Sequence, residues 1–354
     1  MKTEKAEKVE KAADKAGDKG EKMSRKIVGV DDGHYAIKVV DEEGRCFSEP
    51  SRAQHGKQVA AMIGQSNSEV FYTVKDTDEV FTVGPFLPNP EDTRFNGFPT
   101  SSLNLVLVHN ALRAAGFGGQ QVKIASGLPV NAYFLGNTEQ NKVLIEAKQK
   151  NLSRPVECGI HAVATIAENV VVAEAIAAYF DSMIDMNGKP TEYYEEFKSS
   201  TVGVIDIGGK TTDCAVILPG ANAIDMKRTG SSDIGVLTMY DAINARIKAK
   251  EDFELPPNKL EKLVRTKTLV AGGEKIDVSD IVEDEMKKLA EKIFSAIHPK
   301  IGSGRDLEYI LIVGGGALLL KDYMKAHFKH ALIPERPEFA NARGMLKAAK
   351  YVNR

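Results

Sequence analysis

Short aliphatic runs and segments with helical spacing alternate along the chain from residue 26 onward. The runs Lys26–Val30 and Ile37–Val40 flank an Asp-Asp-Gly turn, which predicts a β-hairpin with acidic residues at its tip. Helical spacing over Leu103–Ala115 precedes a buried strand predicted for Val122–Ser126, which Pro129 stops. Strands that alternate with helices in this way predict an α/β architecture.

The C-terminal half repeats this alternation after a polar stretch at 185–200, which we interpret as the loop between two units. Strands are predicted at 170–172, 201–207, 214–218 and 309–313, and helices at 138–149, 174–183, 234–250, 280–296, 317–327 and 341–351. The same sequence pattern occurs at Val28–Gly33 and at Gly203–Gly208. In each segment an aliphatic strand is followed by Asp, any residue and Gly, and a second aliphatic run begins a few residues later. This match favours an internal duplication.

Composition and charge exclude several classes of protein. The 354 residues carry 47 Lys and Arg against 49 Asp and Glu, so no overall field would draw the protein to nucleic acid or anionic lipid. The longest apolar stretch, Ile310–Leu320, contains three glycines and is far shorter than the ~20 residues that span a bilayer. Cys46, Cys158 and Cys214 form no C-x-x-C pair, which favours the reducing cytoplasm.

The N-terminal residues 1–25 differ from the rest of the chain. From Lys2 to Lys22 the segment is almost entirely Lys, Glu, Asp, Ala and Gly, with Val9 as its one large aliphatic residue. It buries too little apolar area to offset the entropy of ordering, so a disordered charged tail is predicted. We interpret it as a solvated leader, with a weak electrostatic tether to DNA or a partner as the alternative.

The two repeated turns offer the groups that bind a polyphosphate. Glycine N–H groups in a concave bend can surround phosphate oxygens, and a carboxylate at a strand end can hold Mg²⁺ through water. Asp31 and Asp206 occupy the two strand ends. Two such turns facing each other would hold a nucleotide from both sides, although each acid alone is equally typical of an ordinary turn.

The sequence Gly208-Gly209-Lys210-Thr211 does not fit a P-loop. Five residues separate Gly203 from Gly209, whereas the Walker A pattern has four. The run after Thr212 is again strand-like, but a P-loop opens a helix whose N-terminus binds phosphate. A dinucleotide-binding fingerprint fails as well, because 116–121 lacks its last Gly and follows a helical segment.

Six motifs occur in order along the chain: VGVDDGHYAIKV at 28–39, GLP at 127–129, VVVAEAIA at 170–177, VIDIGGKTTD at 204–213, SSDIG at 231–235 and LIVGGGA at 311–317. Together they resemble the actin-like ATPases, and their spacing is most similar to the bacterial plasmid-segregation actins of the ParM/StbA type. The resemblance covers nearly all of residues 26–350. It implies an actin-like (ribonuclease H-like) duplicated fold with a nucleotide cleft between domain I, residues 26–178 completed by 336–354, and domain II, residues 179–335.

The resemblance also implies roles for residues that match the family's motifs. Asp31 and Asp206 would position Mg²⁺ through water, Lys38 would reach the phosphates, and Glu174 would orient the attacking water. Glu174 is predicted at a helix start, where the helix dipole favours an acid in any case. The implied nucleotide-binding residues are Asp32, Gly33, His34, Lys38, Gly208, Gly209, Lys210, Thr211, Thr212, Ser232, Asp233, Gly314, Gly315 and Gly316. His34 departs from the small residue that is usual in the family at its position.

The implied cofactors are ATP or ADP, with GTP open, and Mg²⁺. Hydrolysis would drive the assembly and turnover of filaments that segregate plasmid DNA, with further copies of the chain and a DNA-binding centromere adaptor as partners and plasmid DNA contacted indirectly. Two alternatives remain open: a sugar-type kinase of the same superfamily, with Asp233 or Asp92 as base, and a nucleotide-binding scaffold without turnover. The predicted localisation is cytoplasmic, without membrane attachment. His34, His109 and His161 lack metal-ligand spacing and are interpreted as ordinary, hydrogen-bonded histidines.

Overall fold

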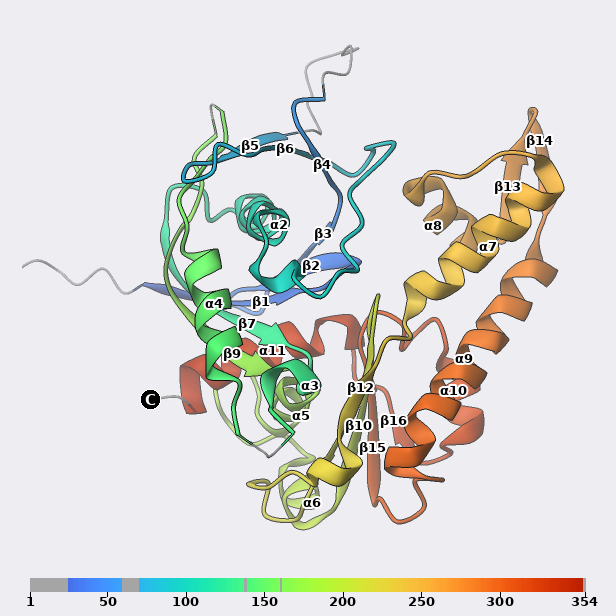
Figure 1. The fold of residues 1–354 in the computed structure, drawn as a ribbon. Helices are drawn as coiled ribbons and strands as arrows, with labels where there is room; N and C mark the ends of the chain where they lie inside the picture. The colour runs from blue at the N-terminus through green and yellow to red at the C-terminus, as the bar shows by residue number, and fades with distance from the viewer. Residues whose placement is uncertain (1–24, 59–69, 137–138, 160, 353–354) are drawn as a thin grey trace, which may run out of the picture.

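The computed structural model of the chain describes residues 25–58, 70–136, 139–159 and 161–352. The disordered tail predicted for residues 1–25 therefore lies outside the described residues, apart from Arg25. Two five-stranded sheets form the centres of two lobes, as Figure 1 shows.

The two sheets have the same strand order and the same strand directions. In the order β3-β2-β1-β7-β9 the first two pairings are antiparallel and the last two parallel, and the order β12-β11-β10-β15-β16 repeats this scheme. The strands are β1 (Lys26–Asp32), β2 (Ala36–Val40), β3 (Cys46–Pro50), β7 (Gln121–Leu128), β9 (Thr165–Ala173), β10 (Val202–Ile207), β11 (Thr212–Ile217), β12 (Gly230–Ser232), β15 (Tyr309–Val313) and β16 (Ala331–Leu332). The predicted α/β fold with an internal duplication is thus confirmed.

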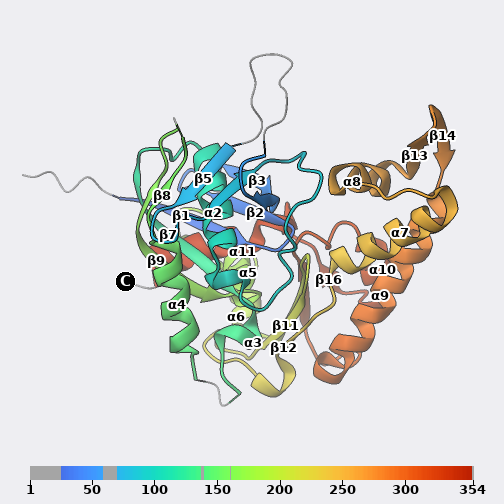
Figure 2. The ribbon, with the colours of Figure 1, turned by 45° about the horizontal axis from the view of Figure 1, so that its top comes forward.

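Two smaller sheets lie outside the two five-stranded sheets, and neither was predicted from the sequence. They consist of β4 (Ala53–His55), β6 (Val80–Val83), β5 (Val70–Val74) and β8 (Val156–Glu157) in one sheet, and of β13 (Thr268–Ala271) and β14 (Glu274–Asp277) in a hairpin. The hairpin lies at the far end of the second lobe (Figure 2). Its strands are short and lack a long alternating apolar pattern, so they give a weak signal.

The helices cover the sheets on both faces. They are α2 (Ser102–Ala114), α3 (Val130–Tyr133), α4 (Lys142–Leu152), α5 (Ile176–Met183), α6 (Tyr194–Ser199), α7 (Val236–Glu251), α8 (Pro257–Thr266), α9 (Ser279–Ile301), α10 (Lys321–His327) and α11 (Ala340–Lys347), with short 3₁₀ turns at Phe98–Thr100, Met226–Arg228 and Pro337–Phe339 and a π-helical turn at Ala348–Val352. Three predictions need correction. The helix predicted from 317 begins at Lys321. The polar stretch 185–200 contains α6, because Phe197 is buried there, and the helix predicted from 138 begins at Lys142.

Each sheet packs its apolar faces against different helices. Residues of α2 and of the four-stranded sheet share one core with β1 and β2. Residues of α7 and α9 pack against β10 and β15 in a second core, whereas α5 packs against the other face of the second sheet. Helix α5 also meets β7 and α11 through Ala177, so it lies between the two lobes.

Helix α11 lies so close to two stretches of backbone that no side chain fits between them. A Cβ at Gly29 in β1 would lie 2.0 Å from the carbonyl oxygen of Ala342, and one at Gly344 would lie 1.7 Å from that of Ala177. Glycine is therefore required at both positions for α11 to fit between β1 and α5.

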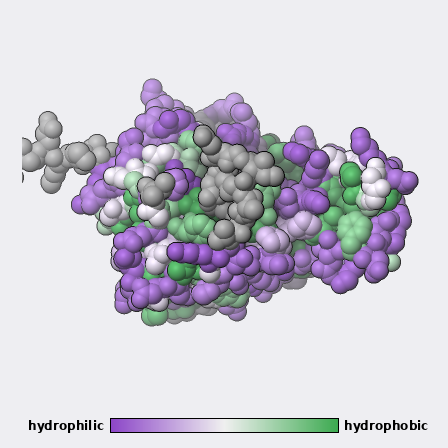
Figure 3. Space-filling view, turned by 90° about the horizontal axis from the view of Figure 1, so that it is seen from above, coloured by the Kyte–Doolittle hydropathy of each residue, from purple (hydrophilic) through white to green (hydrophobic). Residues whose placement is uncertain are grey.

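The face seen from above in Figure 3 is mostly hydrophilic, and hydrophobic residues gather at the end that carries the β13–β14 hairpin. Val270 of this hairpin has an exposed fraction of 62%. In the described part of the chain, no helix combines the length and the apolar character that crossing a membrane requires.

His109 of α2 departs from the expectation of a hydrogen-bonded histidine. It is buried with an exposed fraction of 2%, and neither ring nitrogen has a hydrogen-bond partner. Burial disfavours the charged imidazolium and lowers the pKa of His109 to about 4. The ring is therefore a neutral member of the first core.

The buried imidazole predicts a loss of stability in mild acid. The folded pKa is lower than the unfolded pKa of about 6.5, so the unfolded chain binds more protons as the pH falls from 6.5 towards 4. His109 should remove about 2 kcal/mol of unfolding free energy between pH 7 and pH 5. Denaturant titrations of the wild type and of His109→Leu at both pH values test this, and an equal acid sensitivity of the two proteins would contradict it.

The close contact at Gly344 predicts that Gly344→Ala destabilises the fold by about 3 kcal/mol or more. The direction of this change in unfolding free energy is informative, because alanine normally stabilises a helix by ~1 kcal/mol relative to glycine. Gly136→Ala is the matched control, since a Cβ there would meet nothing within 4 Å. Thermal unfolding of both variants measures the difference, and a Gly344→Ala protein as stable as the control would refute the close packing.

Candidate functional site

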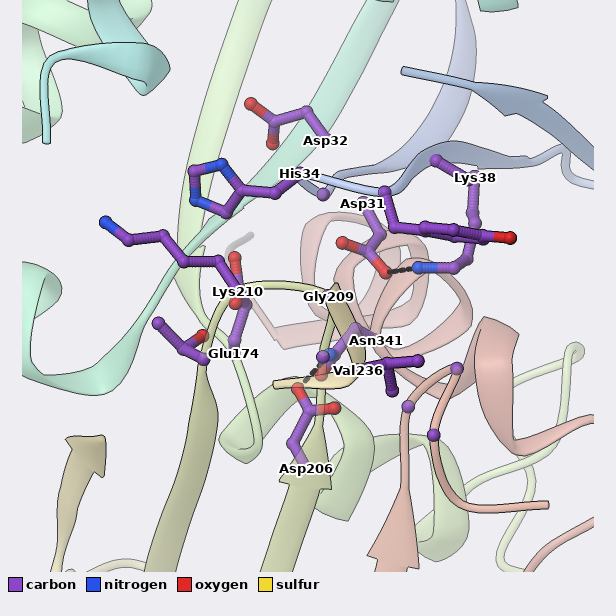
Figure 4. Close-up of a pocket in the computed structure, with 18 of the residues that line it drawn as sticks. Asp31, Asp32, His34, Lys38, Glu174, Asp206, Gly209, Lys210, Val236 and Asn341 are labelled. Atoms are coloured by element: carbon purple, nitrogen blue, oxygen red, sulfur yellow. Dashed lines mark hydrogen bonds and ion pairs between the residues drawn. The ribbon is translucent and has the colours of Figure 1, made fainter. Parts of the chain in front are cut away.

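A cavity of about 360 Å³ lies at the carboxyl ends of the parallel strands of both sheets. Ligands of α/β proteins bind at such strand ends, because the loops that follow are free to form a site. All but three of the residues predicted for the site line this cavity: Asp31, Asp32, Gly33, His34, Lys38, Glu174, Asp206, Gly208, Gly209, Lys210, Thr211, Gly314, Gly315 and Gly316. Figure 4 shows Asp31 and Lys38 on one side and Asp206 on the other.

The duplicated hairpins place equivalent residues at the two sides of the cavity. In the register of β1 and β2, Asp31 is opposite Lys38, and in that of β10 and β11, Asp206 is opposite Asp213. Asp31 and Asp206 have exposed fractions of 6% and 5%. Asp31 therefore corresponds to Asp206, and Lys38 corresponds to Asp213. Lys38 is the one cation among these four side chains.

Lys38 forms an ion pair with Asp31 over 2.8 Å. Burial opposes the charged form of this ammonium group, but the carboxylates of Asp31, Asp206 and Glu174 outweigh it and raise the pKa of Lys38. The Lys38 side chain is therefore a fixed positive charge among acids, which suits contact with phosphate.

The remaining acids repel one another. Burial, followed by the charges of Asp213 and Asp31, raises the pKa of Asp206 to about 7. Burial and the charges of Asp31, Asp213 and Asp206 raise the pKa of Glu174 well above its usual value. Asp213, which the sequence analysis missed, is buried and accepts hydrogen bonds from Val130 N at 3.1 Å, from Thr211 Oγ1 at 3.1 Å and from Ser231 Oγ. Perturbed carboxyl pKa values at a cavity are typical of functional sites.

Glu174 does not begin a helix, contrary to the prediction. Helix α5 begins at Ile176, and the backbone N–H of Ile176 donates to the carbonyl of Glu174 at 2.6 Å. Ala175 between them has φ 61° and ψ −46°, which is the rare and strained form of the γ-turn. The turn directs the chain from β9 into α5, so that Glu174 lines the cavity.

The glycine turn after β15 lets the backbone reach Asp206. Gly314 has φ 87°, a left-handed conformation that favours glycine, and a Cβ there would lie 2.2 Å from Asp206 Oδ1. On the other side of the same carboxylate, Asn341 Nδ2 donates to Asp206 Oδ2 at 2.6 Å. The predicted GGG motif therefore contacts an acid of the site as well as lining the cavity.

Asp32 points towards a buried cation that the sequence did not reveal. Lys148 of α4, which has an exposed fraction of 1%, donates to Asp32 at 2.8 Å and to the carbonyl of Gly127. Asn104 Nδ2 donates to the other oxygen of Asp32 at 2.9 Å. Asp32 is thus neutralised by protein groups and holds the first turn against α2 and α4.

Two further predicted residues at the cavity, His34 and Lys210, contact the loop that precedes α2. The His34 Nδ1 atom lies 2.7 Å from the carbonyl oxygen of Thr93, and burial lowers the pKa of the imidazole. Lys210 Nζ donates to Asn96 Oδ1 at 3.2 Å. These contacts join the two glycine turns to one loop of the first lobe.

Three predicted residues do not line the cavity. Thr212 lies in β11 with an exposed fraction of 1%, and its hydroxyl donates to the carbonyl of Ile234 at 2.7 Å. Ser232 is opposite Thr212 in β12. The side chain of Asp233 is 82% exposed and lies 3.8 Å from Lys210 Nζ. Thr211 lies in the turn before β11 and lines the cavity, whereas Thr212 is the first residue of β11 and its hydroxyl is bonded to Ile234.

One end of the cavity is apolar and was missed by the sequence analysis. Helices α7 and α8 and the turn before α10 supply it, and Tyr35 stacks on Tyr240 there with ring centroids 5.8 Å apart. The residues at this end are Tyr35, Val236, Tyr240, Glu261, Val264, Arg265 and Leu319. An apolar end beside a charged end suits a ligand with an aromatic base and a polyphosphate.

Two family models match the chain. The model for the N-terminal part of plasmid segregation protein ParM matches residues 26–185, and the model for the C-terminal part of the archaeal actin homologue MreB-like matches residues 204–326. No curated protein matches the chain in sequence.

Solved structures match over almost the whole chain at low identity. A 15-stranded ParM filament from Clostridium botulinum has a TM-score of 0.75 and 20% identity, covering 93% of this chain and 99% of its own. A pCBH ParM non-polymerisable quadruple mutant has a TM-score of 0.73 and 20% identity, covering 92% and 99%. The archaeal actin homologue Ta0583 in complex with ADP has a TM-score of 0.71 and 19% identity, covering 92% and 99%.

The duplicated sheets and the cavity between their strand ends define an actin-like fold. The matches to the ParM and MreB-like models extend this likeness to the sequence. In its fold and in the matched parts of its sequence, the chain is thus similar to ParM and to other actin homologues.

Proposed function

We propose that the chain binds and hydrolyses ATP with Mg²⁺ and polymerises into dynamic filaments that segregate plasmid DNA. The observation that carries the proposal is the pair of equivalent Asp–Gly turns, which face one cavity together with Lys38 and Glu174. The match to the ParM N-terminal model supports it. So do two structures of similar fold, one a ParM filament and the other an ADP complex of an archaeal actin homologue.

The donor set fits a metal–nucleotide complex. Glu174, Asp206 and Asp213 all have raised carboxyl pKa values, which marks negative charge that the protein itself does not balance. Among the described residues, no three acidic, His or Cys side chains converge closely enough to bind a metal ion directly. Asp31 and Asp206 would therefore hold Mg²⁺ through water, as that cation prefers.

The proposed hydrolysis needs positioning and charge neutralisation more than covalent chemistry. Bound Mg²⁺ would neutralise charge that develops on the phosphates. Lys38 would contact the phosphates as a point charge, and the turns at Gly33 and Gly208 would offer backbone N–H groups. Glu174 would orient a water and accept its proton, a role for which a raised carboxyl pKa is suited.

The base of the nucleotide would occupy the apolar end of the cavity. Tyr35, Tyr240 and Val264 provide aromatic and aliphatic surface for a purine, and Glu261 and Arg265 provide hydrogen-bonding groups at its edge. Both adenine and guanine could use this surface, so GTP is included in the proposal as a second substrate.

The wider biological role follows from the ParM likeness. We include further copies of the chain as filament partners, a DNA-binding centromere adaptor, indirect contact with plasmid DNA and a cytoplasmic location. The proposed units are domain I, residues 26–178 completed by 336–354, and domain II, residues 179–335. The position of α11 against β1 supports assigning the C-terminal segment to domain I.

No observation favours the sugar kinase alternative. Its two candidate bases do not line the cavity: the side chain of Asp233 is 82% exposed, and Asp92 accepts hydrogen bonds from Arg94 in the loop before α2. Asp233 lies beside Lys210, and Asp92 lines an adjoining cavity with His34, so neither carboxylate faces the space between the two turns.

Addition of Mg-ATP to the full-length protein should raise right-angle light scattering, and the signal should decay as phosphate accumulates in the same cuvette. Removal of the metal with EDTA should abolish both signals, and Mg-GTP measures the base preference. Absence of scattering across a wide concentration range, with ATP consumed only when a sugar is supplied, would refute the proposed function in favour of a kinase.

Glu174→Gln should slow phosphate release about 100-fold, because it keeps the shape of the side chain but cannot accept a proton. Nucleotide binding and assembly should persist, so the filaments should live longer. Glu168→Gln is the matched control, since Glu168 is a half-exposed residue of β9 paired with Lys123 at 2.7 Å. Wild-type turnover in Glu174→Gln would remove this residue from the mechanism.

A further inference from the structure

The side chain of Asn341 joins two acidic regions of the cavity. Its Nδ2 donates to Asp206 Oδ2 at 2.6 Å, and its Oδ1 accepts from the backbone N–H of Ala175 at 3.1 Å. Asn341 is 4% exposed and lines the cavity, where Figure 4 shows its contact with Asp206. The second hydrogen bond reaches the residue next to Glu174.

The chemistry of the two partners fixes the orientation of the amide. A carboxylate at Asp206 accepts hydrogen bonds, and a backbone N–H at Ala175 only donates them. The amide of Asn341 can satisfy both only with its NH₂ towards Asp206 and its oxygen towards Ala175. A hydroxyl can also donate and accept, but from a single oxygen, whereas the amide carries its donor and its acceptor on two separate atoms. An aliphatic side chain could serve neither partner.

The backbone that carries Asn341 has little freedom to move. The neighbouring Ala342 carbonyl packs against Gly29 of β1, and Gly344 packs against the Ala177 carbonyl of α5. Rigid contact on both sides means that Asn341 holds a set position between β1 and α5. Because the backbone is held, a displacement of Asp206 would reach the Ala175 turn through rotation of the Asn341 side chain, whose amide is bonded to both.

The Ala175 turn depends on outside support. Its γ-turn has φ 61° at a residue with a Cβ, a conformation that costs about 1–3 kcal/mol and persists only where the surroundings impose it. The hydrogen bond to Asn341 Oδ1 is one such support, since Ala175 is fully buried and its N–H would otherwise lack a partner. Loss of that bond would free the turn to relax and would move Glu174.

We propose that Asn341 is a positioning residue that couples the carboxylate of Asp206 to the turn that presents Glu174. The inference rests on the proposed function, because it assigns Asp206 to the bound metal–nucleotide and Glu174 to the attacking water. Ligand binding at Asp206 thereby sets the turn in the geometry that hydrolysis needs. Such a residue acts on the chemical step more than on ground-state binding.

Two substitutions separate the two hydrogen bonds. Asn341→Leu retains most of the volume and removes both bonds, whereas Asn341→Asp retains an acceptor for Ala175 N–H and loses the donor to Asp206. Arg343→Gln is the matched control on the same helix, because Arg343 binds Asp181 of α5 at 2.7 Å and does not line the cavity. The control removes an ion pair of α11 outside the cavity and leaves the backbone contacts at Gly29 and Gly344 in place.

The first readout is the split between turnover and affinity. Asn341→Leu should lower kcat for ATP at least tenfold while the Kd for Mg-ADP changes less than about threefold. Arg343→Gln should lower the melting temperature and keep kcat within about twofold of the wild type. Unchanged kcat in Asn341→Leu, or equal losses in kcat and in affinity, would overturn the proposal. Asn341→Asp provides the same test if the leucine variant does not fold.

The second readout is amide hydrogen exchange over residues 174–183 with and without Mg-ADP. Binding should slow exchange in this segment of the wild type, and both Asn341 variants should lose that effect while keeping it at 208–212. Equal slowing at 174–183 in all three proteins would overturn the coupling. A wild type that binds nucleotide but does not hydrolyse it would instead refute the proposed function, so the two failures are distinguishable.

Discussion

Packing of one short helix against two backbones determines the geometry of the cavity. Helix α11 meets β1 at Gly29 and α5 through Gly344, and at both contacts main chain touches main chain. Such contacts set the distance between β1 and α5 without flexible side chains between them. Asp31 lies in β1, and Glu174 shortly precedes α5. The spacing of these two acids therefore follows from the position of α11, a helix that bears none of the nucleotide-binding motifs.

The cavity is also a place of unbalanced charge. Asp206 and Asp213 are buried beside Glu174, and Lys38 is paired with Asp31. Burial of carboxylates without a cation opposes folding, and a ligand that binds only the folded state offsets this cost. The same acids that would bind a metal–nucleotide thus make the protein less stable without it, which is a common feature of functional sites.

The sequence was informative wherever the local chemistry was unusual. Asp and Gly at strand ends identified both turns, and the six motifs placed them in an actin-like fold. Asn341 and Lys148 could not be found in this way, because a single Asn or Lys in a helix has an ordinary local pattern, and its burial depends on distant elements. The apolar end of the cavity was missed for the same reason, since Val264 and Leu319 resemble any core residues.

Asp213 did carry a signal in the sequence. It follows Asp206 at the same spacing at which Lys38 follows Asp31, and the register of the two hairpins makes them equivalent. Because Lys38 and Asp213 differ in charge, the likeness of the two halves is not apparent at this pair of residues. The boundary segment was misinterpreted because α6 is short and most of its residues are polar or charged, although Phe197 anchors it in the core.

The unequal pair Lys38 and Asp213 has a consequence for how such a protein can arise. Two separate copies of one half-size chain would place the same residue at both equivalent positions, either two cations or two anions. Different residues at these two positions need halves that can mutate separately, as the two halves of one duplicated chain can. The duplicated chain can therefore carry a cation opposite Asp31 and an anion opposite Asp206, a division of charge that two identical subunits could not provide.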